Sequence, residues 1–376
     1  MGKGAGDGAP PGSGFIFWLR TYAFGSHRQI PSLDGIRALS AAFVILAHLC
    51  GTARFPLSAQ SSVANLGIFG VRIFFVISGY LITSILLTEQ ERTGTINLSR
   101  FYFRRTLRLF PASWAFITVA AILGSYGLLK LSRYDLLFAY SYTSNYYEGR
   151  SFAIGHLWSL AVEEQFYLLW PATLVLMGPK RGKQFLMGLL CLAPVFRLLS
   201  PFLGAAMNFL TSSDILATGC LLSLWQKELR DNRHYRALLA SPLMPLLPFI
   251  ALAANYTPST KVRWLVGETV MNVCIAVCID WAVKNPRRGA AKLLNLPAVA
   301  TMGVLSYSLY LWQQLFSEFG FTSWLGGFPQ NLVFIVCAAL GSYILIEGPF
   351  LHLRGRLERS QLRSSTTTDG LVRRAD

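Results

Sequence analysis

Long apolar runs separated by short polar segments recur from about residue 33 to residue 350. Most runs approach the ~20 residues that an α-helix needs to cross a ~30 Å hydrocarbon core. Several contain Gly or Pro. The runs are Leu33–Cys50, 67–87, 109–130, 156–177, 185–203, 213–227, 241–256, 265–284, 298–317 and 331–350. This pattern predicts an all-α, polytopic membrane protein with about ten transmembrane helices.

The composition supports a membrane protein. Of the 376 residues, 53% are hydrophobic and only 14% are charged, whereas soluble domains carry about 25% charged residues. The mean hydropathy is +0.44. We therefore expect one membrane domain over residues 30–355, with a Gly/Pro-rich tail before it (1–29) and a basic tail after it (356–376).

Basic residues predict the orientation of the chain. The net charge is +16, from 34 Lys and Arg against 18 Asp and Glu. The basic residues cluster after every second predicted span and in the N-terminal tail, so the positive-inside rule places both termini in the cytoplasm. This explains the charge without nucleic acid. Residues 136–147 should then form an outer hairpin or a partly inserted element. If this segment crossed the membrane fully, the later basic loops would lie on the outer side.

The first span carries two polar side chains in an apolar background. Arg37 and His48 lie eleven residues apart, which is about 1100° of helix, so they fall within about 20° of one face. They differ by roughly 16 Å along the axis. With Arg37 at one membrane border, His48 lies near the midplane. A histidine there is a candidate for function; a structural histidine bonded to a neighbouring helix is the alternative.

A second polar group interrupts the fourth span. His156, Glu163 and Glu164 lie in the stretch HLWSLAVEEQFYLLWP. Acids in hydrocarbon must pair, protonate or line water. A polar network that packs helices together is the alternative. Counting residues from the outer border places both glutamates about 10–12 Å deep, near the depth of His48. We expect His48 and at least one glutamate to share a polar cavity.

Three arginines precede the third span. Arg104, Arg105 and Arg108 lie in FYFRRTLRLFPA, and Arg105 and Arg108 share one helix face. Paired guanidinium groups suit phosphate, although anchoring to lipid headgroups is an alternative. Ser78, Gly79 and Tyr80 inside the second span suggest close helix packing more than catalysis. Other acids near spans, among them Asp214, Glu268 and Glu347, show no diagnostic spacing, and no metal-site motif is present.

Four motifs in order resemble the acyltransferase-3 family of bacterial membrane O-acyltransferases. They are Leu33–Arg37 with Arg37-x10-His48, Phe75–Ile82, Arg105-x-x-Arg108 and Trp158–Tyr167. The resemblance covers roughly residues 30–355. It implies transfer of an acyl group, most simply acetyl, from cytoplasmic acyl-CoA to a hydroxyl beyond the membrane. The sequence departs from the family pattern at Ser212, Gln313 and Gly348, which affects details of acceptor binding.

We therefore expect Arg105 and Arg108, with Arg104 and Arg37 nearby, to bind the donor's phosphates. His48 would act as general base or take the acyl group itself. Glu163 or Glu164 would orient it, and His156 would assist. The acceptor would be a surface glycan or a lipid-linked sugar. The protein would be located in the inner membrane of a bacterium. The sequence leaves open the oligomeric state. A transporter or flippase of an anionic lipid or sugar is the alternative function; a purely structural protein leaves these residues unexplained.

Overall fold

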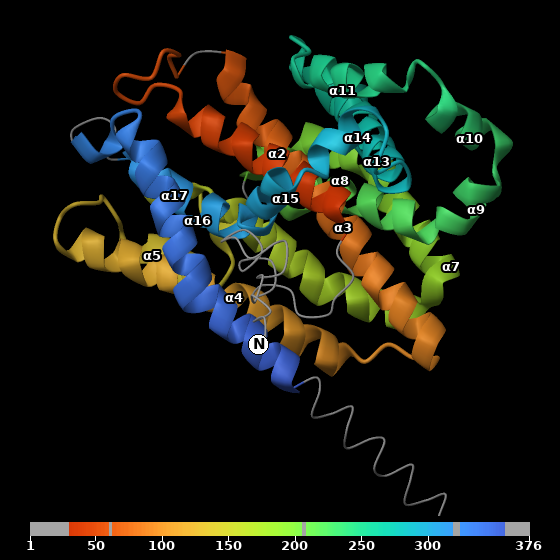
Figure 1. Cartoon of the computed structure of the whole chain (residues 1–376), viewed down its shortest axis with the longest axis horizontal. Coiled ribbons are helices and arrows are strands. Elements are labelled where there is room, and N and C mark those ends of the chain that lie inside the picture. Colours follow the sequence, from red (N-terminus) through yellow and green to blue (C-terminus); the bar gives the residue numbers. More distant parts are fainter. Residues whose placement is uncertain (1–29, 60–61, 205–207, 319–323, 358–376) are drawn as a thin grey trace, which may run out of the picture.

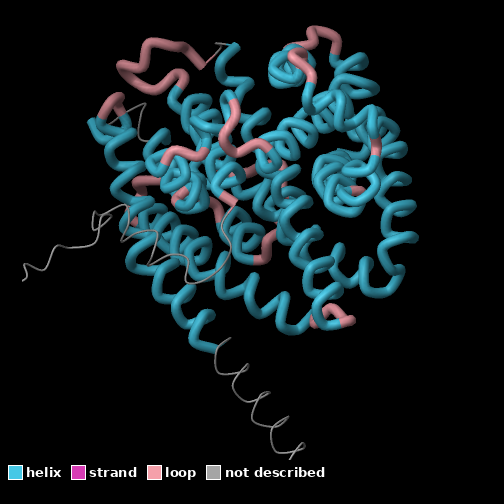
Figure 2. The backbone as a smooth tube through the Cα atoms, turned by 45° about the vertical axis from the view of Figure 1, so that its right-hand side comes forward, coloured by secondary structure: helices cyan, strands magenta, loops and turns pink. Residues whose placement is uncertain are grey.

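The computed structural model describes residues 30–59, 62–204, 208–318 and 324–357 (Figure 1). This part of the chain is built from helices and loops and contains no strand (Figure 2). The all-α prediction is confirmed. The predicted tail 1–29 and nearly all of the predicted tail 356–376 lie outside the described residues.

The first three long helices follow one another along the chain. They are α2 (Pro31–Leu49), α3 (Leu66–Thr93) and α4 (Leu98–Ser125), with a short 3₁₀ helix, η1 (Ser62–Asn65), before α3. Helix α2 packs against α3. Gly94 ends α3 with a positive φ of 76°, a conformation that glycine adopts without a steric penalty. Asn97 caps α4 by accepting a bond from the Arg100 amide at 2.9 Å.

A short connection leads from α4 to the longest helix. It contains α5 (Arg133–Tyr140), η2 (Ser144–Tyr146) and α6 (Phe152–Gly155), and then α7 (Leu157–Leu203) begins. With 8 residues, α5 is too short to cross a membrane. Within α7, Gly178 has non-helical angles of φ 71° and ψ 168°. This break divides α7 into two arms, which correspond to two predicted spans.

The remaining elements complete the bundle. In chain order they are α8 (Asn208–Leu224), α9 (Gln226–Asp231), α10 (Arg233–Ala240), η4 (Met244–Leu246), α11 (Leu247–Asn255), α12 (Thr260–Val262), η5 (Arg263–Gly267), α13 (Glu268–Lys284), α14 (Gly289–Leu294), α15 (Pro297–Val304), α16 (Ser306–Glu318), η7 (Trp324–Gly326), α17 (Gln330–Ser342) and η8 (Tyr343–Glu347). The helix that contains α17 and η8 continues to Leu357. In Figure 1 its C-terminal end lies on the same lower side as the end of α3 and the beginning of α4.

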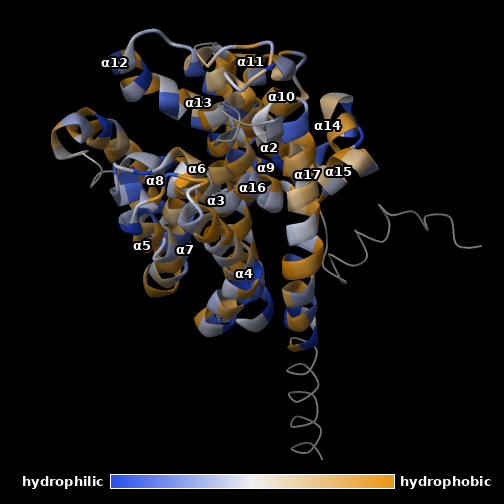
Figure 3. Ribbon diagram, turned by 90° about the vertical axis from the view of Figure 1, so that its left-hand side faces the viewer, coloured by the Kyte–Doolittle hydropathy of each residue, from blue (hydrophilic) through white to orange (hydrophobic). Residues whose placement is uncertain are grey.

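Length and apolar composition identify a multi-pass integral membrane protein. Within the described residues, 6 helices are long and apolar enough to cross a membrane, or 7 if the pair Arg233–Ala240 and Met244–Asn255, bent by 76°, is one span. Large apolar side chains face outward: Leu176 and Phe202 are each 83% exposed. Figure 3 shows hydrophobic residues along much of the outer helices. Such exposed apolar surface suits contact with lipid.

Glycines allow the central helices to approach closely. A Cβ added to Gly79 on α3 would lie 2.0 Å from the carbonyl oxygen of Leu216, and one added to Gly219 on α8 would lie 2.1 Å from that of Val76. Both positions therefore require glycine, because a side chain would overlap the facing backbone. The packing role predicted for Gly79 is confirmed.

Packing also fixes the level of α2 in the bundle. The helix runs antiparallel to α3, because Gly67 lies beside Ala47 whereas Gly70 lies beside Ser40. A Cβ on Gly303 of α15 would lie 1.8 Å from the carbonyl oxygen of Asp34. The first turn of α2 thus packs against α15, while α3 continues to Thr93. As a result, Arg37 lies inside the bundle and His48 lies level with the beginning of α3.

Candidate active site

Four arginines from three helices form one electrostatic group, which we call the arginine cluster: Arg37 on α2, Arg105 and Arg108 on α4, and Arg354 after η8. Arg108 interacts with the other three and with Glu347. Its side chain is exposed, whereas those of Arg37 and Arg105 are only 19% and 17% accessible. An accessible guanidinium surrounded by like charges is a site for a polyanion.

Arg104, the remaining arginine predicted for this site, precedes Arg105 on α4. Consecutive residues of a helix point about 100° apart. Arg104 and Arg105 therefore leave α4 in different directions. The structure thus brings three of the four predicted arginines together and adds Arg354, which the sequence analysis did not identify.

The two glutamates on α7, Glu163 and Glu164, lie beside the arginine cluster. Glu164 Oε1 lies 3.9 Å from Arg105 Nε, and the Arg105 guanidinium lies 3.6 Å from the centroid of the Tyr167 ring. Glu163 accepts hydrogen bonds from the hydroxyls of Ser78 and Tyr167. It also interacts electrostatically with Arg105 and Arg37. The carboxylates are therefore placed to hold the arginines in position.

His48 is held by its own helix. Its Nδ1 lies 2.9 Å from the carbonyl oxygen of Val44. Because a carbonyl only accepts, Nδ1 must donate, and the neutral imidazole then keeps its lone pair on Nε2. The ring is partly accessible and makes an edge contact with Phe152, at 6.1 Å between centroids. Nε2 is thus available as a base or nucleophile.

His156 lies near His48 at the beginning of α7. Its ring is 4% exposed and lies between Phe116 and Tyr310, each at 5.4 Å between centroids. Neither ring nitrogen makes a hydrogen bond within the described residues, and the two histidines interact electrostatically. A second, buried imidazole therefore lies beside the first, with the Gln314 side chain and the Leu311 backbone as its polar neighbours.

The histidines and the glutamates lie at different levels, contrary to our expectation. Ser78, the partner of Glu163, is eleven residues beyond Gly67, which packs beside Ala47; this is roughly 16 Å along α3. No hydrogen bond or ion pair joins His48 to Glu163 or Glu164. The expectation of one depth assumed that α2 begins at a membrane border, whereas its first turn is packed against α15.

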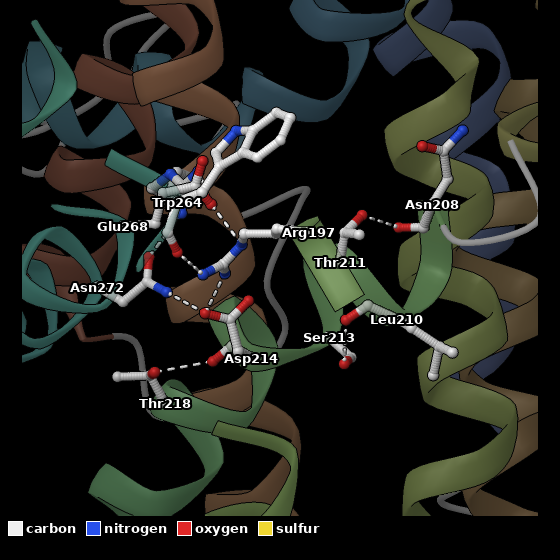
Figure 4. A network of polar contacts seen from close by, with 11 residues as sticks. Arg197, Asn208, Leu210, Thr211, Ser213, Asp214, Thr218, Trp264, Glu268 and Asn272 are labelled. Carbon is white, nitrogen blue, oxygen red and sulfur yellow. Dashed lines mark hydrogen bonds and ion pairs between the residues drawn. The ribbon is translucent and has the colours of Figure 1, made fainter. Parts of the chain in front are cut away.

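A second group of charged residues joins α3, α7, α8 and α13 (Figure 4). The sequence did not predict that these residues form one group. Arg197 Nη2 lies 2.5 Å from Asp214 Oδ2, and Arg197 Nε lies 2.7 Å from Glu268 Oε2. Arg72 Nη2 lies 3.1 Å from the same oxygen of Glu268. Asn272 accepts from Arg72 at 3.0 Å and donates to Asp214 at 2.9 Å. We call these five residues the ion-pair network. Its two positive and two negative charges balance.

The comparisons with known proteins identify the family. The family model described as "Acyltransferase domain", that of the acyltransferase-3 family, matches residues 30–347. The chain therefore belongs to this family, as its motifs suggested. No solved structure matches the chain.

Curated relatives carry related names. The chain is 31% identical over 319 residues to "Peptidoglycan O-acetyltransferase OatA" of Listeria monocytogenes, covering 76% of this chain and 49% of that protein. It is 30% identical over 362 residues to a "Putative O-acetyltransferase" of Staphylococcus aureus, covering 86% and 57%. A "Putative peptidoglycan O-acetyltransferase YrhL" of Bacillus subtilis is 32% identical over 326 residues, covering 76% and 48%. The chain thus spans about half the length of these relatives.

Proposed function

We propose that the protein is a membrane O-acyltransferase that moves an acyl group, most simply acetyl, from acyl-CoA to a hydroxyl of a cell-surface glycan. The observation that carries the proposal is the arrangement on α2, where Arg37 of the arginine cluster and His48 lie on one face, roughly 16 Å apart. A polyanion site and an imidazole with an available nitrogen are thus connected by a single helix. The family and the names of the relatives agree with this chemistry.

The donor would bind at the arginine cluster. Arg105 and Arg108 would bind the phosphates of CoA, with Arg37 and Arg354 adding positive charge. Glu163, Glu164 and Tyr167 would fix the Arg105 guanidinium, which they already contact or neutralise. The pantetheine arm is an extended chain, and it would run beside α2 and bring the thioester to His48.

His48 Nε2 would then take the proton of the acceptor hydroxyl. As the acceptor oxygen attacks the thioester carbonyl, the new C–O bond forms, the C–S bond breaks and the proton passes to the leaving thiolate. In the alternative route, Nε2 attacks the thioester carbonyl and the CoA thiolate leaves; the acceptor oxygen then attacks the acyl-imidazole, the C–N bond breaks and the hydroxyl proton passes to the thiolate. Both routes require Nδ1 to carry its hydrogen, which the Val44 carbonyl favours. His156 would assist from the acceptor side.

The proposed setting is the inner membrane of a bacterium, with ten spans and both termini in the cytoplasm. Basic residues follow every second predicted span, which supports this orientation. It would turn the arginine cluster toward cytoplasmic acyl-CoA and His48 toward the outer side. Two of the relatives are named for peptidoglycan, so peptidoglycan or a similar glycan is the proposed acceptor.

Membranes that contain the protein, supplied with acetyl-CoA labelled in the acetyl group and with peptidoglycan fragments, would test the proposal. We expect label in a base-labile ester on the glycan, and no label with His48→Ala. An anionic lipid or sugar that moves across the membrane, with no new ester, would overturn the enzyme in favour of the transporter alternative.

A further inference from the structure

A cavity of about 230 Å³ opens beside the ion-pair network. Its walls come from α3, both arms of α7, α8 and the segment around η5. The lining residues that matter here are Arg72, Trp158, Arg197, Ser212, Trp264 and Glu268. Ligand pockets for drug-sized molecules are about 300–1,000 Å³, so this cavity suits a single small ring. The arginine cluster and His48 line none of it.

The lining combines two indole rings with polar groups that are held in place and still have free hydrogen-bonding capacity. Both guanidinium groups contact Glu268 through Oε2, and Oε1 makes no hydrogen bond within the described residues. Ser212 also makes none there. Arg72 and Arg197 are 6% and 3% exposed, so the groups behind the cavity wall are fixed. An acceptor oxygen, a hydroxyl and aromatic faces suit the hydroxyls and the apolar C–H face of a sugar ring.

The charge balance argues for a neutral occupant. Arg72 and Arg197 are matched by Asp214 and Glu268, to which they are paired directly. A phosphate would find no excess positive charge here and would meet the Glu268 carboxylate, a like charge. The arginine cluster differs in accessibility: Arg108 is exposed among other arginines, whereas the carboxylates near the cluster act mainly on Arg105 and Arg37. An anion can therefore reach an arginine in the cluster but not in the ion-pair network.

The cavity also lies next to the proposed centre. Trp158, one of its walls, is two residues beyond His156 on the chain. Its ring makes an edge contact with Phe75 at 6.2 Å between centroids, and Phe75 also lines the cavity. Phe75 is one helical turn from Ser78, which donates to Glu163. The cavity wall thus includes a residue close to His156 on the chain and a residue one helical turn from the partner of Glu163.

We propose that this cavity is a subsite for a neutral sugar unit of the acceptor, adjacent along the glycan to the unit that is acylated. The proposal rests on the proposed function and adds where the acceptor is bound. Glu268 Oε1 and Ser212 hydrogen bond to hydroxyls of that unit, and Trp158 and Trp264 pack on its ring. Binding a neighbouring neutral unit, such as N-acetylglucosamine, holds the reacting hydroxyl near His48, and the cavity excludes an anionic unit.

The test measures acetyl transfer to N-acetylglucosamine–N-acetylmuramic acid fragments of increasing length. For the wild type, kcat/KM should rise by about tenfold or more from the monosaccharide to the tetrasaccharide, as expected when a charged hydrogen bond and a ring contact are added. Glu268→Gln should lose most of this gain by raising the KM for the longer fragments. The KM for acetyl-CoA should not change.

Two further variants keep the test independent of folding. Ser212→Trp fills the cavity without removing an ion pair and should also abolish the gain with length. Glu228→Gln, on a surface carboxylate paired with Lys183, is the matched control and should behave as the wild type. A normal gain in Ser212→Trp would overturn the subsite, even though the proposed function would stand. Transfer by the wild type to no fragment would overturn the proposed acceptor itself, and the subsite with it.

Discussion

Arg108 and Arg197 are arginines in helices of one bundle, and their surroundings are opposite. Arg108 is exposed, and three of the four charged groups that act on it are other arginines. Arg197 is 3% exposed and contacts two carboxylates at 2.5 and 2.7 Å. The first arrangement leaves positive charge available to a ligand. The second satisfies the charge internally and leaves hydrogen-bonding groups at the edge of a cavity.

The difference indicates that the two regions bind different kinds of ligand. A positive, accessible cluster lowers the free energy of a bound polyanion, whereas a balanced network fixes side chains without attracting anions. Each histidine is connected to one of the two regions through the chain. Arg37 of the arginine cluster shares α2 with His48, and Trp158 of the cavity wall is two residues beyond His156 at the beginning of α7. Donor and acceptor sites with different charge would prevent either substrate from occupying the other's place.

The largest expected effect is at His48, the proposed catalytic residue. His48→Ala should reduce transfer by about 100-fold or more, because general-base catalysis typically contributes 10²–10⁴. Donor binding should persist, since the arginine cluster is unchanged. Transfer rates and acetyl-CoA affinity in the same membranes check both parts. Activity near the wild-type value in this variant would exclude His48 as base and as nucleophile.

The next effect concerns the arginine cluster alone. Arg105→Ala and Arg108→Ala should each weaken acetyl-CoA binding by roughly 10- to 100-fold, as expected for a lost charge-assisted hydrogen bond. Lys at either position should restore only part of the affinity, because an ammonium lacks the bidentate geometry. The KM for the acceptor should not change. Full rescue by Lys would favour lipid anchoring over phosphate binding.

The sequence predicted the all-α class, several of the long helices and most of the arginine cluster, but the count of ten spans is not confirmed: the described residues contain 6 or 7 candidates. Apolar runs determined the helix positions, and the spacing of Arg105 and Arg108 placed them on one face. The level of α2 could not be predicted, because it depends on the contact of Asp34 with Gly303, far away in the chain. The hydrogen bond between Ser78 and Glu163 could not be predicted for the same reason. The two residues lie 85 positions apart, and only the packing of α3 on α7 brings them together.

The members of the ion-pair network could be predicted from the sequence, but their pairing could not. Arg72 and Arg197 are single charges inside the apolar runs 67–87 and 185–203, and the rule that identified His48 also applies to them. Asp214 and Glu268 were noted as acids near spans. Their pairing with the arginines brings together four helices, and no spacing along one helix encodes such a pairing. A search for isolated charges of both signs in and near predicted spans would have found its four charged members.

Stability separates the two regions further. Arg197→Ala should lower the free energy of unfolding by about 3–5 kcal/mol, because it leaves buried carboxylates unpaired. Arg108→Ala should change it by much less, since its charge is exposed and repelled by Arg37, Arg105 and Arg354. Thermal unfolding of the two variants in the same detergent gives the comparison. Equal shifts in the unfolding temperature would mean that the charge balance inferred here does not govern stability.

The smallest expected effect is on salt dependence, which tests the charge difference without a substitution. Raising KCl from about 0.05 M to about 0.5 M shortens the Debye length from over 10 Å to below 8 Å and screens exposed charges. The KM for acetyl-CoA should therefore rise a few-fold, because its phosphates are bound by a cluster with an accessible arginine. The KM for the oligosaccharide acceptor should change much less, since the ion pairs beside the cavity are buried and already balanced. Substituting Arg108 by Ala should reduce the salt dependence of the donor, while Glu228→Gln should leave it as it is. A parallel rise of both KM values would show that one common electrostatic field, and not two regions of different charge, selects the substrates.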